Sequence, residues 1–389
     1  MRVPTLRFLG AFALAPLLGS CDAVRNPAQP AHPTLSQAAT ATILDLGTLG
    51  GSRSSALAIN ERGQVVGTST TGSGALHAFL WDGTMHDLGT LGGDYSEPRA
   101  IDPRGQVVGL SSTASGDRHA FLWDAGTMQD LGTLGGPSSD ALALNPGGQA
   151  VGSSYTSSGD LHPFLWDGTA MRDLGTIGGS VNTTATAVNP AGRVTGMWFP
   201  PGPATYSRGF FWENGTMQDL GTLGGGSVVV VAINGRGQVT GQSLNGSGSF
   251  RAFLWDSGTM RDLGTLGGRE SFGTAINDKG QVVGESRTAD GGRHAFLWDG
   301  GTMLDLGTLG GNSRATAVNG QGEVVGFSTT GSFETHGFFW DGQTMHDLGT
   351  LGGSQSGAGD LNNAGQIVGS STTPSGESHA VLWTVGRAP

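Results

Sequence analysis

One heptapeptide, DLGTLGG, recurs along most of this chain and constrains its fold more than any other feature. An eighth copy, from Asp173, differs only at Ile177. The seven identical copies begin at Asp45, Asp87, Asp130, Asp219, Asp262, Asp305 and Asp347. A tryptophan recurs with the same period, at positions 81, 123, 166, 212, 255, 298, 340 and 383. The spacing of 42 or 43 residues, with one of 46, is typical of four-stranded β-propeller blades.

Each repeat contains four short runs rich in β-branched and aromatic residues. In Thr274–Gly307 these runs are TAIN, QVVGES, HAFLWD and MLDLG, and Gly, Asn or Asp separates them. Such short connections favour antiparallel hairpins. Both faces of HAFLWD carry bulky apolar groups, which predicts a strand covered on both sides. Radial packing of four-stranded sheets meets that demand.

Counting the runs predicts how the array ends. The first three runs occur eight times after residue 52, whereas the fourth occurs seven times after them and once before, at Ile43–Gly47. We therefore expect an all-β, eight-bladed propeller of four-stranded antiparallel blades, closed by the N-terminal strand beside Val381–Trp383. The expected divisions are a signal peptide (1–20), a tether (21–42) and the propeller (43–385). The 71 glycines serve the turns, including the corner from each outer strand to the next inner strand.

The N-terminus carries the features of a secretory signal. Two arginines precede the apolar run Phe8–Leu18, and Leu-Gly-Ser-Cys follows, ending at Cys21. This arrangement resembles a bacterial lipoprotein signal, which implies acylation of Cys21. An ordinary secretory signal is the alternative. A Pro- and Ala-rich tether follows, so we expect secretion across the inner membrane and lipid anchoring to the cell envelope.

The repeat also resembles a known family. The pattern HAFLWD, M-x-DLGTLGG and A-x-N-x-x-G-Q-V-V-G is similar to that of the bacterial extracellular HAF-repeat family, over nearly all of 43–384. The resemblance supports the expected fold and location and implies no particular reaction. The net charge of −11 disfavours nucleic acid as a partner, and we expect a monomer.

The polar residue that opens the third strand is always a His or Arg. We expect a structural role for this set, with each side chain bonded to an acceptor across the blade junction, for which the heptapeptide Asp is a candidate. Its members are His77, His119, His162, Arg208, Arg251, His294, His336 and His379. A metal site is the weaker alternative, because the residues belong to separate blades. The recurring Trp residues are expected in the core. We predict no metal and no cofactor.

The connections on one face of the expected disc vary between repeats, and varied loops on a rigid frame are a usual place for binding. One of them, from Trp198 and Phe199 to Tyr206, is long and aromatic. The ligand-binding candidates are Trp198, Phe199, Tyr206, Tyr95, Glu97, Arg99, Arg269, Glu270 and Phe272. Neutral drift of exposed loops, and a local plug over the fourth blade, are the alternatives.

No catalytic residue is predicted, because G-x-S-x-G and P-loop motifs are absent from the sequence and Cys21 is its only cysteine. The expected function is a membrane-tethered, non-catalytic binding or scaffold module for a protein or glycan. The alternatives are a propeller-fold lyase or glycoside hydrolase, and a purely structural envelope protein. A buried carboxylate pair with raised pKa near the propeller axis would favour an enzyme.

Overall fold

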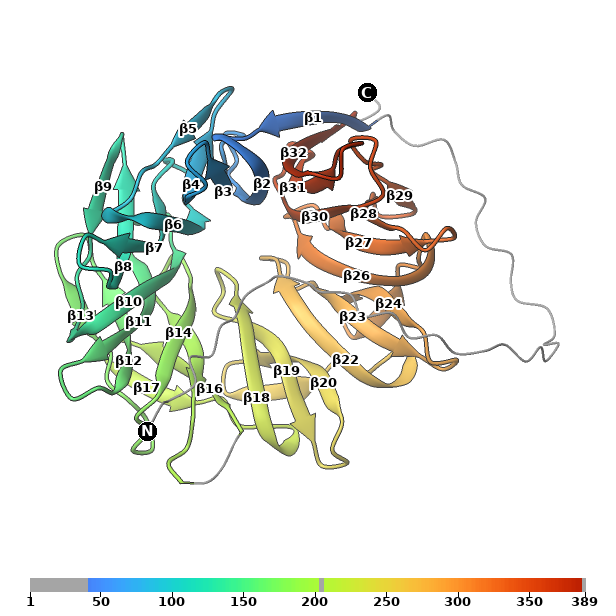
Figure 1. Cartoon of the computed structure of the whole chain (residues 1–389). Coiled ribbons are helices and arrows are strands. Elements are labelled where there is room, and N and C mark those ends of the chain that lie inside the picture. Colours follow the sequence, from blue (N-terminus) through green and yellow to red (C-terminus); the bar gives the residue numbers. More distant parts are fainter. Residues whose placement is uncertain (1–40, 203–205, 387–389) are drawn as a thin grey trace. The chain divides into compact units, whose positions relative to one another are not determined.

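The computed structural model describes residues 41–202 and 206–386. These residues form 32 strands and no helix, arranged as eight four-stranded antiparallel blades (Figure 1). Blades 1–4 comprise β2 (Gly50–Ile59), β3 (Val65–Thr71), β4 (Leu76–Trp81), β5 (Met85–Asp87); β6 (Gly92–Ile101), β7 (Val107–Thr113), β8 (Arg118–Asp124), β9 (Thr127–Asp130); β10 (Gly135–Leu144), β11 (Ala150–Thr156), β12 (Leu161–Trp166), β13 (Met171–Asp173); and β14 (Thr183–Val188), β15 (Val194–Trp198), β16 (Arg208–Glu213), β17 (Thr216–Asp219). Blades 5–8 comprise β18 (Gly224–Ile233), β19 (Val239–Asn245), β20 (Phe250–Asp256), β21 (Thr259–Asp262); β22 (Gly267–Ile276), β23 (Val282–Thr288), β24 (Arg293–Asp299), β25 (Thr302–Asp305); β26 (Gly310–Val318), β27 (Val324–Thr330), β28 (Thr335–Trp340), β29 (Met345–Asp347); and β30 (Ser356–Leu361), β31 (Gln366–Thr372), β32 (Ser378–Val385), with β1 (Ala41–Gly47).

The N-terminal strand completes the last blade, as the strand count predicts. β1 pairs with β32 in antiparallel register, with Ile43 opposite Trp383. Blade 8 is also tied to blade 1, because the Asn362 side chain donates to the backbone oxygen of Asn60 (3.1 Å). The Ala380 N–H likewise donates to Ser54 Oγ (2.8 Å). The predicted closed, eight-bladed fold is therefore confirmed.

Each DLGTLGG segment forms the corner between an outer strand and the next inner strand. In the first copy, Asp45 Oδ1 accepts the N–H of Gly47 (2.8 Å), and Thr48 Oγ1 donates to the backbone oxygen of Gly51 (2.8 Å). Gly47 has φ +76° and Gly50 has φ +96°, conformations that glycine adopts at no steric cost. Because the ring turns this corner between every pair of blades, the same seven residues recur.

Hydrophobic clusters fill the junctions between consecutive blades. One cluster combines Val66 and Leu80 of blade 1 with Val107 and Phe121 of blade 2. The second strand of a blade approaches the inner strand closely: in blade 1, a Cβ on Gly67 would lie 2.0 Å from the Ser55 oxygen. The phenylalanines of the third strands are fully buried in blades 1–7, namely Phe79, Phe121, Phe164, Phe210, Phe253, Phe296 and Phe338. These clusters make the ring a continuous core.

A polar link also joins the blades near the end of each inner strand. Seven asparagines donate through Nδ2 to a backbone oxygen of the next blade, over 2.9–3.3 Å. These residues are Asn60, Asn145, Asn189, Asn234, Asn277, Asn319 and Asn362. Blade 2 has Asp102 at this position, and a carboxylate has no hydrogen to donate. The junction of blades 2 and 3 therefore lacks this link.

Candidate functional site

Each inner strand contains a β-bulge near its C-terminal end, and the bulged residue differs between blades. At this bulge the register shifts by one residue, which leaves that residue without a partner opposite. The bulged residues are Leu57, Arg99, Leu142, Thr186, Val231, Thr274, Thr316 and Gly359 in blades 1–8. Arg99 is the only charged member of this set, and Leu57 and Leu142 flank it in the neighbouring blades. Blade 2 thus departs from the repeat near the propeller axis.

Arg99 belongs to a group of four polar residues that we call the inner-strand cluster: Tyr95, Glu97 and Arg99 of β6, and Asp140 of β10. Arg99 Nη1 donates to Glu97 Oε1 (2.7 Å), and Nη2 donates to Asp140 Oδ2 (3.3 Å). The Tyr95 hydroxyl donates to the other oxygen of Glu97. The three charged side chains retain about a quarter of their exposure. One guanidinium therefore bridges two carboxylates from adjacent blades.

Burial shifts the pKa values of two residues in the inner-strand cluster. It raises the pKa of Asp140, against the opposing effect of the Arg99 guanidinium. Burial, together with the hydrogen bond to Glu97, raises the pKa of Tyr95 to about 12. Arg99 Nε and Asp140 Oδ1 are buried and have no hydrogen-bond partner among the described residues. Perturbed pKa values and unpaired buried polar atoms are typical of functional sites.

A surface cavity of about 430 Å³ adjoins the cluster at Tyr95. We call it the blade 2 pocket; it is lined by Gly93, Asp94, Tyr95, Ser112, Thr113, Ala114, Ser115, Gly116 and Arg118. The Arg118 guanidinium lies over the Tyr95 ring, 5.0 Å from its centroid. Tyr95 therefore contributes its ring to the pocket and its hydroxyl to the inner-strand cluster.

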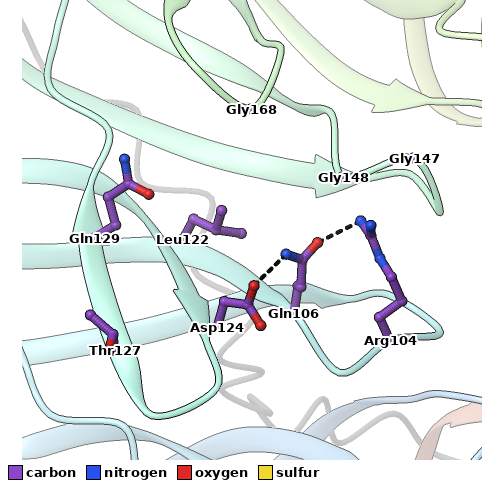
Figure 2. Close-up of a pocket in the computed structure, with 9 residues that line it drawn as sticks. All are labelled: Arg104, Gln106, Leu122, Asp124, Thr127, Gln129, Gly147, Gly148 and Gly168. Carbon is purple, nitrogen blue, oxygen red and sulfur yellow. Dashed lines mark hydrogen bonds between the residues drawn. The ribbon is translucent and has the colours of Figure 1, made fainter.

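A second cavity, of about 340 Å³, lies at the opposite end of blade 2, between blades 2 and 3. This junction pocket is lined by Arg104, Gln106, Leu122, Asp124, Thr127, Gln129, Gly147, Gly148 and Gly168 (Figure 2). Arg104 Nη2 donates to Gln106 Oε1 (2.6 Å), and Gln106 Nε2 donates to Asp124 Oδ2 (2.8 Å) (Figure 2).

The junction pocket has its origin in Asp102. The Asp102 carboxylate accepts Arg104 Nε (2.9 Å), so Arg104 hydrogen-bonds within its own blade while its Nη2 packs against Gly148 of blade 3. The cations at the equivalent turn position in blades 1 and 6 donate to the next blade: Arg62 to the Arg104 oxygen (3.3 Å) and Lys279 to the Gln321 oxygen (3.2 Å). The Asn-to-Asp difference thus removes the asparagine link between blades 2 and 3 and binds Arg104 to its own blade.

The prediction of an aromatic binding platform on the long connection of blade 4 is wrong for Trp198. Trp198 is the last residue of β15 and only 8% exposed, in the core cluster that joins blades 3 and 4. Its ring lies below the corner at Gly178, where a Cβ would meet it at 3.0 Å. Phe199 is half-buried and Tyr206 is exposed. Trp198 therefore acts as the local plug that was the alternative.

The other ligand-binding candidates lie on inner strands rather than in loops, because β6 and β22 begin directly at the corner glycines Gly92 and Gly267. Tyr95, Glu97 and Arg99 come together in the inner-strand cluster. In β22, Arg269 is exposed and Glu270 accepts Arg287 Nε (3.2 Å). Phe272 packs against Phe250, with 6.0 Å between ring centroids. The blade 6 candidates do not join those of blade 2.

The His and Arg residues of the third strand bond within their own blade. His119 Nδ1 lies 2.8 Å from Asp130 Oδ2, and Arg208 Nη2 lies 2.9 Å from Asp219 Oδ1. The same His–Asp bond occurs at His77, His162, His294, His336 and His379. The expected bond across the junction is therefore wrong. Phe79 lies opposite Asp87, so His77, two residues away, shares the face of that Asp. The Nε of Arg251 is buried and has no hydrogen-bond partner in the described residues.

Sequence reasoning missed Asp102, Arg118 and Asp140. Aligning the eight repeats would have revealed Asp102, since the other seven have Asn there. Cys21 lies outside the described residues. Within the described ranges, no group of three or more His, Cys, Asp or Glu residues is placed to hold a metal ion. The described part of the chain also includes no helix long and apolar enough to span a bilayer.

Comparisons with known proteins support the fold. No family model matches the sequence, and no curated protein matches it. Among solved structures, the chain is similar to the β-propeller domain of the Trilobed protease from Pyrococcus furiosus, with a TM-score of 0.52 and 11% identity. That match covers 77% of this chain and 99% of the other. The other propeller is described as having an open velcro topology, whereas β1 and β32 pair here.

Two whole peptidases are similar to a comparable degree. A puromycin-hydrolyzing peptidase from Mycobacterium tuberculosis matches with a TM-score of 0.52 and 16% identity, over 84% of this chain and 59% of that one. A prolyl endopeptidase matches with a TM-score of 0.53 and 11% identity, over 86% and 55%. This chain therefore spans somewhat more than half of either peptidase. The expected function as a non-catalytic binding or scaffold module is corrected, because the matching propellers belong to peptidases.

Proposed function

We propose that this chain takes part in peptide hydrolysis as the propeller of a peptidase, and that the inner-strand cluster engages the peptide substrate. The observation that carries the proposal is the charge of Arg99, at a bulge position that is uncharged in the other seven blades, with Glu97 and Asp140 bonded to it. Arg99 lies between Leu57, which is 45% exposed, and Leu142. Charged groups beside aliphatic surface suit a peptide, which presents backbone polar groups and apolar side chains together.

The likeness to peptidase propellers supports the same assignment. The sequence has no G-x-S-x-G motif, so the hydrolytic nucleophile is assigned to a separate catalytic domain or chain. In this arrangement the propeller selects and orients the substrate, and the cluster supplies the orientation. Holding a substrate in a reactive position is itself a large part of catalysis.

The test uses the protein in its own cells. Deleting its gene should lower the cleavage of fluorogenic peptides, and the wild-type gene should restore it. A double variant, Glu97→Ser with Arg99→Leu, gives blade 2 the residues that blade 1 has as Ser55 and Leu57. It should fold and fail to restore cleavage. Val231→Ala, at the bulge of blade 5, is the matched control and should restore it.

A second readout locates the peptide. Octapeptides carrying a benzophenone group should cross-link to β6 and β10 of the wild-type chain, and less to the double variant. Unchanged peptide cleavage after gene deletion, together with cross-links away from blades 2 and 3, would refute the proposal.

One observation favours a second candidate, an acid–base enzyme such as a glycoside hydrolase or lyase. Asp140 has a raised pKa through burial, and Glu97 lies on the other side of the same guanidinium. Two carboxyl groups in different environments can serve as acid and base. The purified chain should then release products from neutral or uronate-containing polysaccharides, and Asp140→Asn should abolish release. Absence of products from every polysaccharide removes this candidate.

We also propose that the propeller is held at the cell envelope through Cys21. The support is the lipoprotein-like order of charged, apolar and small residues before that cysteine. Mass spectrometry of the N-terminal peptide should show an acylated Cys21, and Cys21→Ser should release the protein into the medium. An unmodified Cys21 in the mature chain would contradict the proposal.

A further inference from the structure

Arg118 lines the blade 2 pocket and forms no close ion pair, although its charge acts on Asp140 from a distance. The ion pairs found in residues 41–202 and 206–386 do not include it. Arg293 begins the corresponding strand of blade 6, and there Nη1 lies 3.4 Å from Glu285 Oε1. Blade 2 has Leu110 at the position of Glu285. The repeat thus provides an acid for this arginine in one blade and an apolar residue in the other.

The free guanidinium is held in a defined place. It stacks over the Tyr95 ring at 5.0 Å, and the Tyr95 hydroxyl is bonded to Glu97. A stacked arginine keeps the edge of its planar fork available, and that fork matches the two oxygens of a carboxylate. The cavity of about 430 Å³ beside it is large enough for a terminal residue of a peptide.

We propose that the blade 2 pocket binds a carboxylate of the peptide substrate, with Arg118 as the partner and Tyr95 as its support. The inference rests on the proposed function in peptide hydrolysis and names the substrate chemistry. A monoanion fits better than a phosphate dianion, because Asp94 lines the same pocket and the chain carries a net charge of −11. The carboxylate comes from the C-terminus of the peptide or from an acidic side chain.

Fluorescence anisotropy with labelled hexapeptides separates these sources. One peptide has a free C-terminus and no acidic residue, one is amidated and contains an aspartate, and one is amidated and neutral. At low salt, at least one of the two carboxylate peptides should bind the full chain about tenfold more tightly than the neutral peptide. The preferred peptide identifies the source.

Arg118→Gln should remove this preference, and Arg293→Gln should keep it. Both arginines are largely exposed, so neither variant should change the melting temperature by more than about 1 °C. Equal binding of acid and neutral peptides, or a preference that survives Arg118→Gln, would overturn the carboxylate pocket and leave the proposed function standing. Failure of all three peptides to bind, together with unchanged peptide cleavage after gene deletion, would overturn both.

Discussion

The Asp102→Asn substitution should stabilise the ring by restoring its missing link. The Asp102 side chain is completely buried, and its Oδ1 accepts the N–H groups of Arg104 (2.8 Å) and Gln106 (2.9 Å). The Oδ1 of Asn60 makes the equivalent bonds in blade 1 at 3.0 Å, so asparagine at 102 keeps them. It also gains an Nδ2 that faces blade 3, where the Asn145 oxygen takes the place of the acceptor used at the other seven junctions.

The expected change in the free energy of unfolding follows from the interactions that the substitution adds and removes. The new bond between neutral buried groups is worth about 1 kcal/mol. The lost ion pair involves Arg104, whose side chain is 50% exposed, so it contributes about 1 kcal/mol or less, and the buried carboxylate disappears with it. The net gain is about 0.5–1.5 kcal/mol. In a domain of this size, that corresponds to a rise in melting temperature of about 1–2 °C.

The converse variant gives a larger signal. Asn145→Asp breaks the bond to the Asn189 oxygen (3.0 Å) and buries a carboxylate where the residue equivalent to Arg104 is Gly147. It should destabilise the fold by about 2–4 kcal/mol. Calorimetry and urea titration of the wild type and both variants measure the effects. A decrease in stability for Asp102→Asn, or no loss for Asn145→Asp, would refute the idea that the asparagines hold the blades together.

Three further substitutions test other features. Phe333 is 91% exposed and has φ +66°, a backbone conformation that strains a residue other than glycine. Phe333→Gly should therefore stabilise the fold by about 0.5–1 kcal/mol in urea titration, and a loss of stability would show that this strain is absent. Burial raises the pKa of the Asp360 carboxyl to about 6, above its unfolded value, so wild-type stability should fall as pH rises from about 4 to 6. Asp360→Ala introduces the residue that the other seven blades have at this position, and melting curves of this variant should no longer show that fall. The hydrogen bond to Asp305 raises the pKa of His294, so His294→Ala should cost about 0.5–1 kcal/mol below pH 6 and less above the raised pKa; an equal cost at pH 5 and pH 8 would show that the pair acts without charge.

The fold could be predicted because its determinants are local and repeated. The corner needs glycine at fixed places, the third strand needs large residues on both faces, and the count of strands requires β1 to pair with β32. Eight copies of one pattern average out the ambiguity of a single copy. The His–Asp bond was placed on the wrong side of the blade because the register of the hairpin between the third and fourth strands depends on the length of its turn. In blade 1, Trp81 lies opposite Met85, which puts Phe79 opposite Asp87 and His77 on the same face as that Asp.

The site was harder to predict for a different reason. Tyr95, Glu97 and Arg99 were predicted as ligand-binding candidates, but Asp140 comes from the next repeat. The packing of blade 2 against blade 3 brings its carboxylate to 3.3 Å from Arg99 Nη2. Trp198 was wrongly predicted to bind a ligand, because the sequence of a lone aromatic residue outside the repeat does not show whether its side chain is exposed or packed in the core. The shortened inner strand β14 leaves a space under its corner, and the Trp198 ring occupies that space.

The repeat itself explains why function should lie at one junction. A ring of eight identical blades would offer eight identical sites, and a peptide would bind all of them with the same affinity. Specificity therefore requires a blade that departs from the pattern, and its neighbours must tolerate the departure. Blade 2 differs at Tyr95, Arg99 and Asp102, at both ends of one inner strand, while the hydrophobic cluster it shares with blade 3 remains intact. If Asp102→Asn both stabilises the ring and lowers peptide cleavage, the missing link serves the site, because the junction of blades 2 and 3 is then less stable than it could be for the sake of function.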